Sequence, residues 1–116
     1  MTVLLVDTEA ARMQCTARLL QTLLPDISGL STTDPLLAAK YAFKQPVDLL
    51  IAGLNMKRMD GLSLSEFLRE TNPNVEVCLF GTRADFARCP SRQSFHPLTL
   101  PIQEAELKAV LLRCRR

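Results

Sequence analysis

The chain has 116 residues, of which 47% are hydrophobic and 22% are charged, and its formal net charge at pH 7 is +2. This length fits one domain, and the apolar content excludes a disordered segment. The nearly balanced charge argues against a dedicated nucleic-acid binder, because such domains usually carry a basic face. No apolar run reaches the ~20 residues of a membrane span, and the first residues lack the pattern of a signal peptide.

The cysteines stand far apart, with no CxxC pair and no metal-site spacing to the single histidine. These residues are Cys15, Cys78, Cys89, Cys114 and His96. We therefore expect reduced thiols and a cytoplasmic protein. Apolar neighbours predict that Cys15, Cys78 and Cys114 are small buried side chains, whereas Cys89 is expected to be accessible.

Strand and helix signals alternate from the start of the chain. Residues 3–6 form a short apolar run, typical of a strand that is covered on both faces. Thr8 is placed to cap the helix that follows. The apolar positions of this helix repeat every four residues: Ala11, Cys15, Leu19 and Leu23. A weak second strand is predicted over residues 27–31.

The middle of the chain repeats the alternation. Asp34 followed by Pro35 is the pattern of an N-cap with proline at the first helical position, and it predicts a helix that ends before Pro46. Residues 48–52 predict the most buried strand. Gly61 leads into a third helix, which ends before the next proline.

The last third is less regular. Residues 75–80 predict a fourth strand, and the helix over residues 83–88 has room for only about two turns. A short fifth strand fits residues 94–99, where Pro97 confines it to the sheet edge. The last helix has apolar residues at i, i+3, i+4 and i+7: Leu107, Val110, Leu111 and Cys114.

Five strands alternating with five helices predict an α/β fold, with a doubly wound five-stranded parallel sheet, helices on both faces and a shortened fourth helix. Functional groups in such sheets gather at the carboxyl ends of the strands. The residues expected there are Asp7-Thr8-Glu9, Gly53-Leu54-Asn55, Gly81-Thr82 and Thr99-Leu100-Pro101.

These strand ends resemble the receiver domain of bacterial two-component response regulators, and the resemblance covers essentially the whole chain. The segments that carry it are VLLVDTE, DLLIAGLNMKRMDGLSL, NPNVEVCLF and LTLPIQEAEL. It implies a flavodoxin-like fold and a role in phosphorelay signal transduction. The receiver-like domain spans residues 1–116, either as a complete protein or as the N-terminal part of a longer regulator.

The resemblance also shows departures from the family pattern. Alignment on Met56-x-x-Met59-Asp60-Gly61 places Gly53 where the family has its phosphoaccepting aspartate. Asp7 keeps the first acid of the metal-binding pair, but Thr8 replaces the second. Glycine has no nucleophile, and Mg²⁺ is usually bound through carboxylates.

Two further departures affect groups that would respond to a phosphoryl group. Leu100 stands at the position of the family's lysine. The switch position is Gly81 by straightforward spacing, or Thr82 after a one-residue shift. These changes predict a degenerate site with weak or lost Mg²⁺ binding, no cofactor and no metal, although Asp7 and Asn55 are the ligands that remain.

We therefore expect a pseudo-receiver without enzymatic activity, which signals through phosphorylation-independent protein–protein contact. The alternative is an atypical receiver that is phosphorylated at Asp7 or Asp60 and controls a transcriptional output domain. The expected partner is another protein or an attached output domain, and a homodimer through the face of the fourth helix, fifth strand and fifth helix is the other arrangement. Nucleic-acid and membrane contacts are not expected.

Two groups of surface residues complete these expectations. The contact face is expected to include Leu98, Ile102, Lys108 and Arg115. The basic residues on the loops around the vacated acceptor position are Lys57, Arg58 and Arg83.

Overall fold

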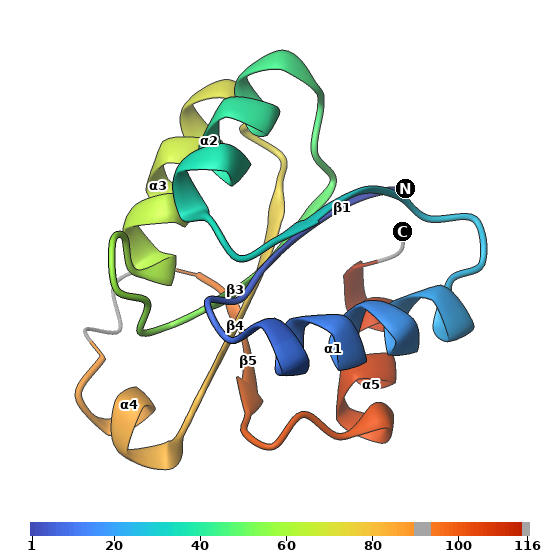
Figure 1. Cartoon of the computed structure of the whole chain (residues 1–116), viewed down its shortest axis with the longest axis vertical. Helices are drawn as coiled ribbons and strands as arrows, with labels where there is room; N and C mark the ends of the chain where they lie inside the picture. Colours follow the sequence, from blue (N-terminus) through green and yellow to red (C-terminus); the bar gives the residue numbers. More distant parts are fainter. Residues whose placement is uncertain (90–93, 115–116) are drawn as a thin grey trace.

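The computed structural model describes residues 1–89 and 94–114. Strands and helices alternate along this part of the chain (Figure 1). They are β1 (Thr2–Val6), α1 (Ala10–Leu23), β2 (Ser28–Thr32), α2 (Pro35–Lys44), β3 (Leu49–Gly53), α3 (Gly61–Thr71), β4 (Glu76–Gly81), α4 (Arg83–Ala87), β5 (His96–Thr99) and α5 (Glu104–Cys114).

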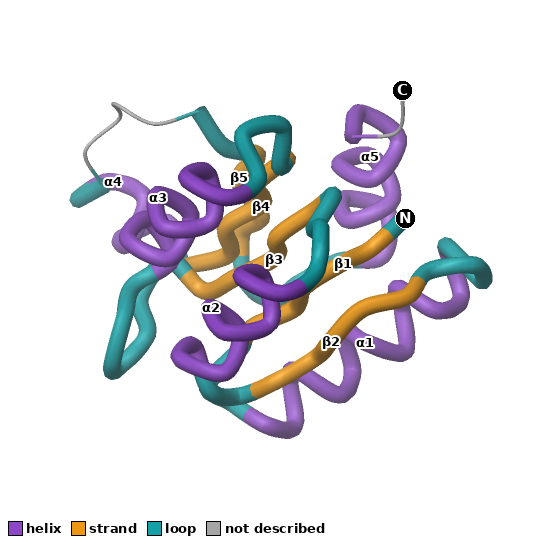
Figure 2. The backbone as a smooth tube through the Cα atoms, turned by 90° about the horizontal axis from the view of Figure 1, so that it is seen from above, coloured by secondary structure: helices purple, strands orange, loops and turns teal. Residues whose placement is uncertain are grey.

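The strands form one parallel sheet in the order β2-β1-β3-β4-β5. Figures 1 and 2 show α1 and α5 on one face of the sheet and α2 and α3 on the other. The doubly wound α/β fold is therefore confirmed. All five strands point the same way, so their carboxyl ends meet at one edge, as expected for this class of sheet.

The helices bury two apolar layers, one on each face of the sheet. Leu4, Leu50 and Leu79 belong to the layer under α2 and α3, whereas Leu5 and Ile51 belong to the layer under α1 and α5. Successive side chains of a strand point to opposite faces, so the central strands supply both layers. Every residue of β3 is buried, as its continuous apolar run predicts.

Several local signals of the sequence are confirmed. Asp34 caps α2 by accepting a hydrogen bond from the Leu36 backbone N–H at 3.0 Å, and Pro35 is the first helical residue. The fourth helix is short, with five residues. Strand β5 contains Pro97 and lies at the sheet edge, where a missing N–H is tolerated.

The start and the buried face of α1 differ from the prediction. The N-cap residue is Glu9 rather than Thr8, and its side chain makes no capping hydrogen bond. Cys15 and Ala11 are exposed, while Thr16 is buried. A strict four-residue repeat drifts by about 40° per step around a helix of 3.6 residues per turn, so the apolar stripe leaves the sheet toward the start of α1.

One predicted surface residue is also buried. Leu98 is completely shielded from solvent under α5, so it is not part of a contact face. Ile102 is half-buried and Lys108 is exposed, but Arg115 lies outside the described residues. Cys89, predicted to be accessible, is half-buried. In the described part of the chain, no helix has the length and apolar character needed to cross a membrane.

Candidate functional site

The carboxyl ends of the central strands bring Asp7, Gly53 and Phe80 into one row. Val6 of β1 pairs with Ala52 of β3, and Gly53 of β3 pairs with Phe80 of β4. Asp7 directly follows β1, so it takes the next place in this register. All three positions face the layer under α1 and α5, because alternate residues of a strand share a face.

Asp7 is held by a neighbouring arginine. Its side chain is 1% exposed, and both of its oxygens accept hydrogen bonds from Arg12, at 2.7 Å from Nε and 2.9 Å from Nη2. One oxygen also accepts from the Glu9 backbone N–H at 2.9 Å. Such two-point, charge-assisted pairing is among the strongest polar contacts in proteins. The Asp7 carboxylate is therefore already neutralised by the chain itself.

Arg12 is fixed by more than this ion pair. Its guanidinium carbon lies 5.3 Å from the centroid of the Phe80 ring, a distance typical of a cation–π contact. A second nitrogen, Nη1, lies 3.2 Å from a carboxylate oxygen of Glu9. Hydrogen bonding to Asp7 raises the pKa of Arg12 above its ordinary value, although partial burial opposes this. The guanidinium is a permanent positive charge at this edge.

The sequence prediction missed Arg12. A charged residue in the first turn of a helix is usually solvated, so its presence alone gives no signal. The spacing does give one, because a helix that starts directly after a strand end turns its first residues back toward that end. A five-residue step from Asp7 to Arg12 fits this geometry.

Gly53 leaves little room for a side chain. A Cβ atom at this position would lie 3.0 Å from the Met56 Cγ atom and 3.3 Å from the Phe80 ring. Gly53 itself is buried. The space at the predicted acceptor position is thus narrowed by the side chains of Met56 and Phe80, and neither provides a nucleophile in place of an aspartate.

Polar residues that follow β3 and β4 are hydrogen-bonded to one another. The Asn55 side-chain amide donates to Asp85 at 2.6 Å. Thr82 and Asp85 form a reciprocal capping box at the start of α4, at 3.1 and 2.9 Å. The hydrogen bond from the Thr82 backbone is the largest cause of a lowered pKa of Asp85, and the Thr82 and Asn55 side chains lower it further. The Thr82 hydroxyl is therefore committed to the helix cap, and Gly81 beside it has no hydroxyl.

The remaining predicted site residues do not complete a charged pocket. Leu100 is half-buried against the layer under α1 and α5, and its backbone N–H donates to the Gly81 carbonyl at 2.8 Å. Thr8, the residue after Asp7, is exposed. Asp60 caps α3 by accepting from the Ser63 backbone N–H at 2.7 Å.

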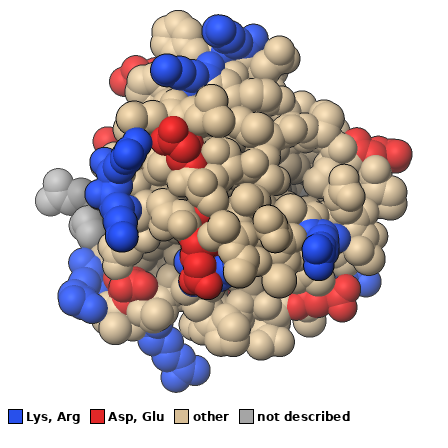
Figure 3. All heavy atoms as spheres, viewed as in Figure 1, with Lys and Arg blue, Asp and Glu red and all other residues tan. Residues whose placement is uncertain are grey.

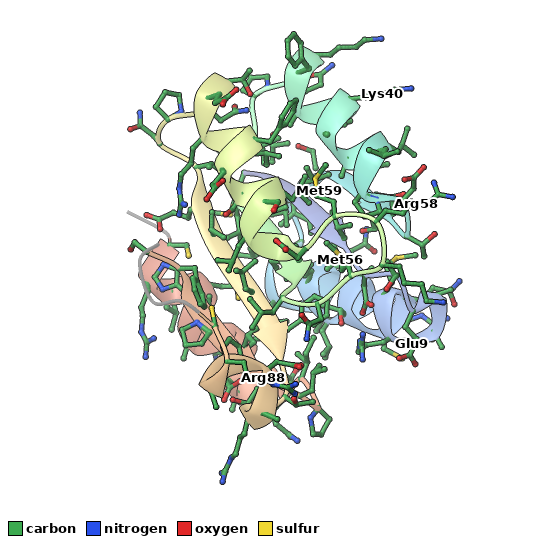
Figure 4. All side chains as sticks on the ribbon, turned by 90° about the vertical axis from the view of Figure 1, so that its left-hand side faces the viewer. Glu9, Lys40, Met56, Arg58, Met59 and Arg88 are labelled. Carbon is green, nitrogen blue, oxygen red and sulfur yellow. The ribbon has the colours of Figure 1, made fainter. Side chains whose placement is uncertain are left out.

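The loop between β3 and α3 carries two of the basic residues that were expected to surround the acceptor position, Lys57 and Arg58, whereas Arg83 begins α4. Figure 4 shows Arg58 on this loop, together with Met56 and Met59, and Glu9 beside α1. Lys57, Arg58 and Arg83 are exposed. The cation that binds the Asp7 carboxylate is Arg12 instead. On the face drawn in Figure 3, basic and acidic side chains are interspersed.

Comparison with known proteins agrees with this architecture. The receiver domain of a response regulator from Clostridium thermocellum has a TM-score of 0.85 at 15% identity, covering 97% of this chain and 92% of that one. A two-component transcriptional regulator from Clostridium phytofermentans has a TM-score of 0.80 at 23% identity, with 98% and 90% covered. No match was found among curated proteins.

A third relative contains a metal. The receiver domain of a sensor histidine kinase from Pseudomonas aeruginosa, with magnesium coordinated in its active-site cleft, has a TM-score of 0.82 at 22% identity, covering 97% of this chain and 94% of that one. The family model for the response regulator receiver domain matches residues 3–111. The chain is thus a two-component signalling module and belongs to the response regulator receiver domain family.

Proposed function

We propose that this receiver domain signals without accepting a phosphoryl group, and that Arg12 takes the place of the metal cation at Asp7. The observation that carries the proposal is the two-point pairing of Arg12 with both oxygens of the buried Asp7 carboxylate. The domain then has no enzymatic activity of its own and needs no cofactor.

Phosphoryl transfer to a carboxylate requires charge neutralisation by a metal ion and an in-line nucleophile. Mg²⁺ prefers oxygen ligands in an octahedral shell and usually takes one or two carboxylates. Here it would have to displace Arg12 from Asp7, and Thr8 provides no second carboxylate. Gly53 offers no nucleophile, and Leu100 cannot donate a hydrogen bond to a phosphoryl oxygen.

Phosphorylation on another acid is the competing function. Asp7 would have to give up Arg12, and Asp60 would have to give up its N-cap hydrogen bond to Ser63. Loss of an N-cap interaction typically costs about 1 kcal/mol. Both acids therefore already have structural roles, which favours the phosphorylation-independent function.

Intact-mass measurement after incubation with acetyl phosphate and Mg²⁺ tests the proposal. We expect no phosphoryl adduct, and no change of melting temperature with a beryllofluoride mimic, because a ligand that does not bind cannot stabilise the fold. An adduct that is lost in Asp60→Asn, or a melting shift abolished by Asp7→Ala, would establish the competing function.

Signalling in this state must come from contact with a partner, either a separate protein or an attached output domain. The outer face of α5 provides a surface for it: Leu112 is 62% exposed, one turn after the exposed Lys108. The exposed leucine offers apolar area to a partner, and the basic residue favours an acidic partner by charge complementarity. We also propose that the domain is cytoplasmic and that it binds neither nucleic acid nor a membrane.

Charge reversal tests this face. We expect Lys108→Glu and Leu112→Asp each to weaken association with a partner, or with a second copy, at least about 10-fold, because α5 loses charge and apolar contact. Lys40→Glu and Leu37→Asp, at exposed positions of α2, are the matched controls. Equal effects at both helices, or an affinity that responds to phosphodonor, would refute a constitutive α5 surface.

A further inference from the structure

A second group of reactive side chains lies at the opposite end of the sheet from Asp7. Glu76 begins β4, His96 begins β5 and Cys114 ends α5. One donor atom from each residue lies within 4.8 Å of the other two. Within residues 1–89 and 94–114, no other cluster of three histidine, cysteine or acidic side chains meets this distance.

The fold brings these residues together from distant parts of the sequence. His96 pairs with Cys78 across β4 and β5, and Glu76 precedes Cys78 by two residues, so Glu76 and Cys78 share a face of the sheet. Figures 1 and 2 show the C-terminal end of α5 at the same end of the molecule as the N-terminus. The last turn of α5 therefore lies over the starting ends of the strands.

Two of the donors are accessible and one is buried. The His96 and Glu76 side chains are 26% and 28% exposed, and His96 Nε2 lies 3.2 Å from a Glu76 carboxylate oxygen. Both residues line a polar cleft of about 330 Å³. Cys114 is buried at 7% exposure. A small ion can therefore reach the imidazole and carboxylate from solvent, and the Cys114 Sγ atom lies within 4.8 Å of both donor atoms.

The donor set has a clear chemical preference. Imidazole, thiolate and carboxylate are the three protein ligands of Zn²⁺, with metal–ligand distances of about 2.0–2.3 Å. Donor atoms around a tetrahedral ion of this size are separated by about 3–4 Å, so small side-chain shifts bring this group into range. A thiol and an imidazole do not suit Mg²⁺ or Ca²⁺, which take oxygen ligands.

We propose that Glu76, His96 and Cys114 form a three-ligand site for a divalent transition metal of the zinc class, with solvent as the fourth ligand. Cys114 binds as the thiolate, and its proton is released to solvent when the metal enters. Cys78 is not a ligand, because its sulfur does not belong to the group of donor atoms that lie within 4.8 Å of one another. A bound metal would fasten the end of α5 to β4 and β5.

Titration with Co²⁺, a coloured substitute for Zn²⁺, tests the site. The full chain, freed of metal with a chelator and kept reduced, should develop a thiolate-to-cobalt charge-transfer band that added Zn²⁺ removes. Cys114→Ser should abolish the band. His96→Gln and Glu76→Gln should each weaken Co²⁺ binding at least about 100-fold. Loss of a residue that only supports a ligand by a hydrogen bond costs about 10–100-fold in metal affinity, and loss of the ligand itself costs more. Cys15→Ser, at the exposed cysteine of α1, is the matched control.

Any other outcome would reject the proposed metal site. A plain ion pair between His96 and Glu76 produces no charge-transfer band, and a band that survives Cys114→Ser belongs to another cysteine. If Cys114→Ser does not fold, judged by circular dichroism, His96→Gln decides. His96 is at the sheet edge, so this variant should fold, and unchanged Co²⁺ affinity in it would reject the proposal.

Discussion

At the scale of single residues, the pairing of Asp7 and Arg12 dominates the carboxyl edge of the sheet. A carboxylate that is 1% exposed needs a partner, since an unpaired buried charge is costly. Arg12 provides that partner from the next helix and also covers the Phe80 ring. The acid that matches the first metal-binding acid of the family is thus paired with Arg12 in the unmodified chain.

Differences in burial predict that the cysteines differ in reactivity. Cys15 is exposed, whereas Cys78 is buried and desolvation, followed by the nearby Cys114 and Glu106, raises its pKa. The thiolate is the reactive form of cysteine. We expect iodoacetamide at neutral pH to modify Cys15 first and to leave Cys78 unmodified until the chain unfolds, as measured by peptide mass spectrometry. Equal rates in the folded protein would contradict this burial.

At the scale of elements, the sequence predicted helix starts well where cap residues act locally. The Asp34-Pro35 pair located the start of α2 because both residues act within one turn. Thr8 is not the cap, because the turn after β1 is one residue longer than predicted and α1 begins at Ala10. Cys15 was placed on the wrong face because a short apolar repeat does not fix the angular position of a helix on a sheet.

The capping box of α4 gives a prediction with a pH dependence. Thr82→Ala removes the side-chain cap and should cost about 1 kcal/mol of unfolding free energy. It should also move the pKa of Asp85 upward, toward its ordinary value, because Thr82 helps to lower it. NMR titration of the Asp85 carboxyl carbon in both proteins measures this shift. An identical pKa of Asp85 in the two proteins would contradict this capping geometry.

The sign of the stability effect follows from that lowered pKa. The folded chain holds Asp85 ionised at a pH where the unfolded chain protonates it, so the contribution is present above the ordinary aspartate pKa of about 3.9. It is lost as the pH falls through the lowered value. The stability difference between wild type and Asp85→Asn should therefore shrink on acidification below about pH 4.

At the scale of the whole molecule, the fold was predictable because it depends on repeated local patterns. Continuous apolar strands such as β3, separated by helices, leave few arrangements other than a parallel sheet covered on both faces. The residues at the strand ends could be located for the same reason, since Gly53 and Leu100 can be counted from each strand. Contacts between distant elements could not be counted in this way.

Two contacts escaped sequence reasoning: a local one, between Asp7 and Arg12 five residues later, and a long-range one. Arg12 meets Asp7 only because α1 folds back over the end of β1. The cluster of Glu76, His96 and Cys114 joins two strands and the last helix, so no spacing motif reveals it. A sequence pattern predicts which elements form, but the exact juxtaposition of side chains depends on how those elements pack.

The central claim, that Arg12 replaces the metal at Asp7, is tested most directly by thermal unfolding with and without Mg²⁺. Arg12→Ala should lose about 1–3 kcal/mol of unfolding free energy, because the buried Asp7 carboxylate loses its partner while the arginine is itself 31% exposed. Mg²⁺ should restore part of this stability in Arg12→Ala and should leave wild type and the exposed-site control Arg18→Ala unchanged. A Mg²⁺ shift in wild type as large as that in Arg12→Ala would contradict the account.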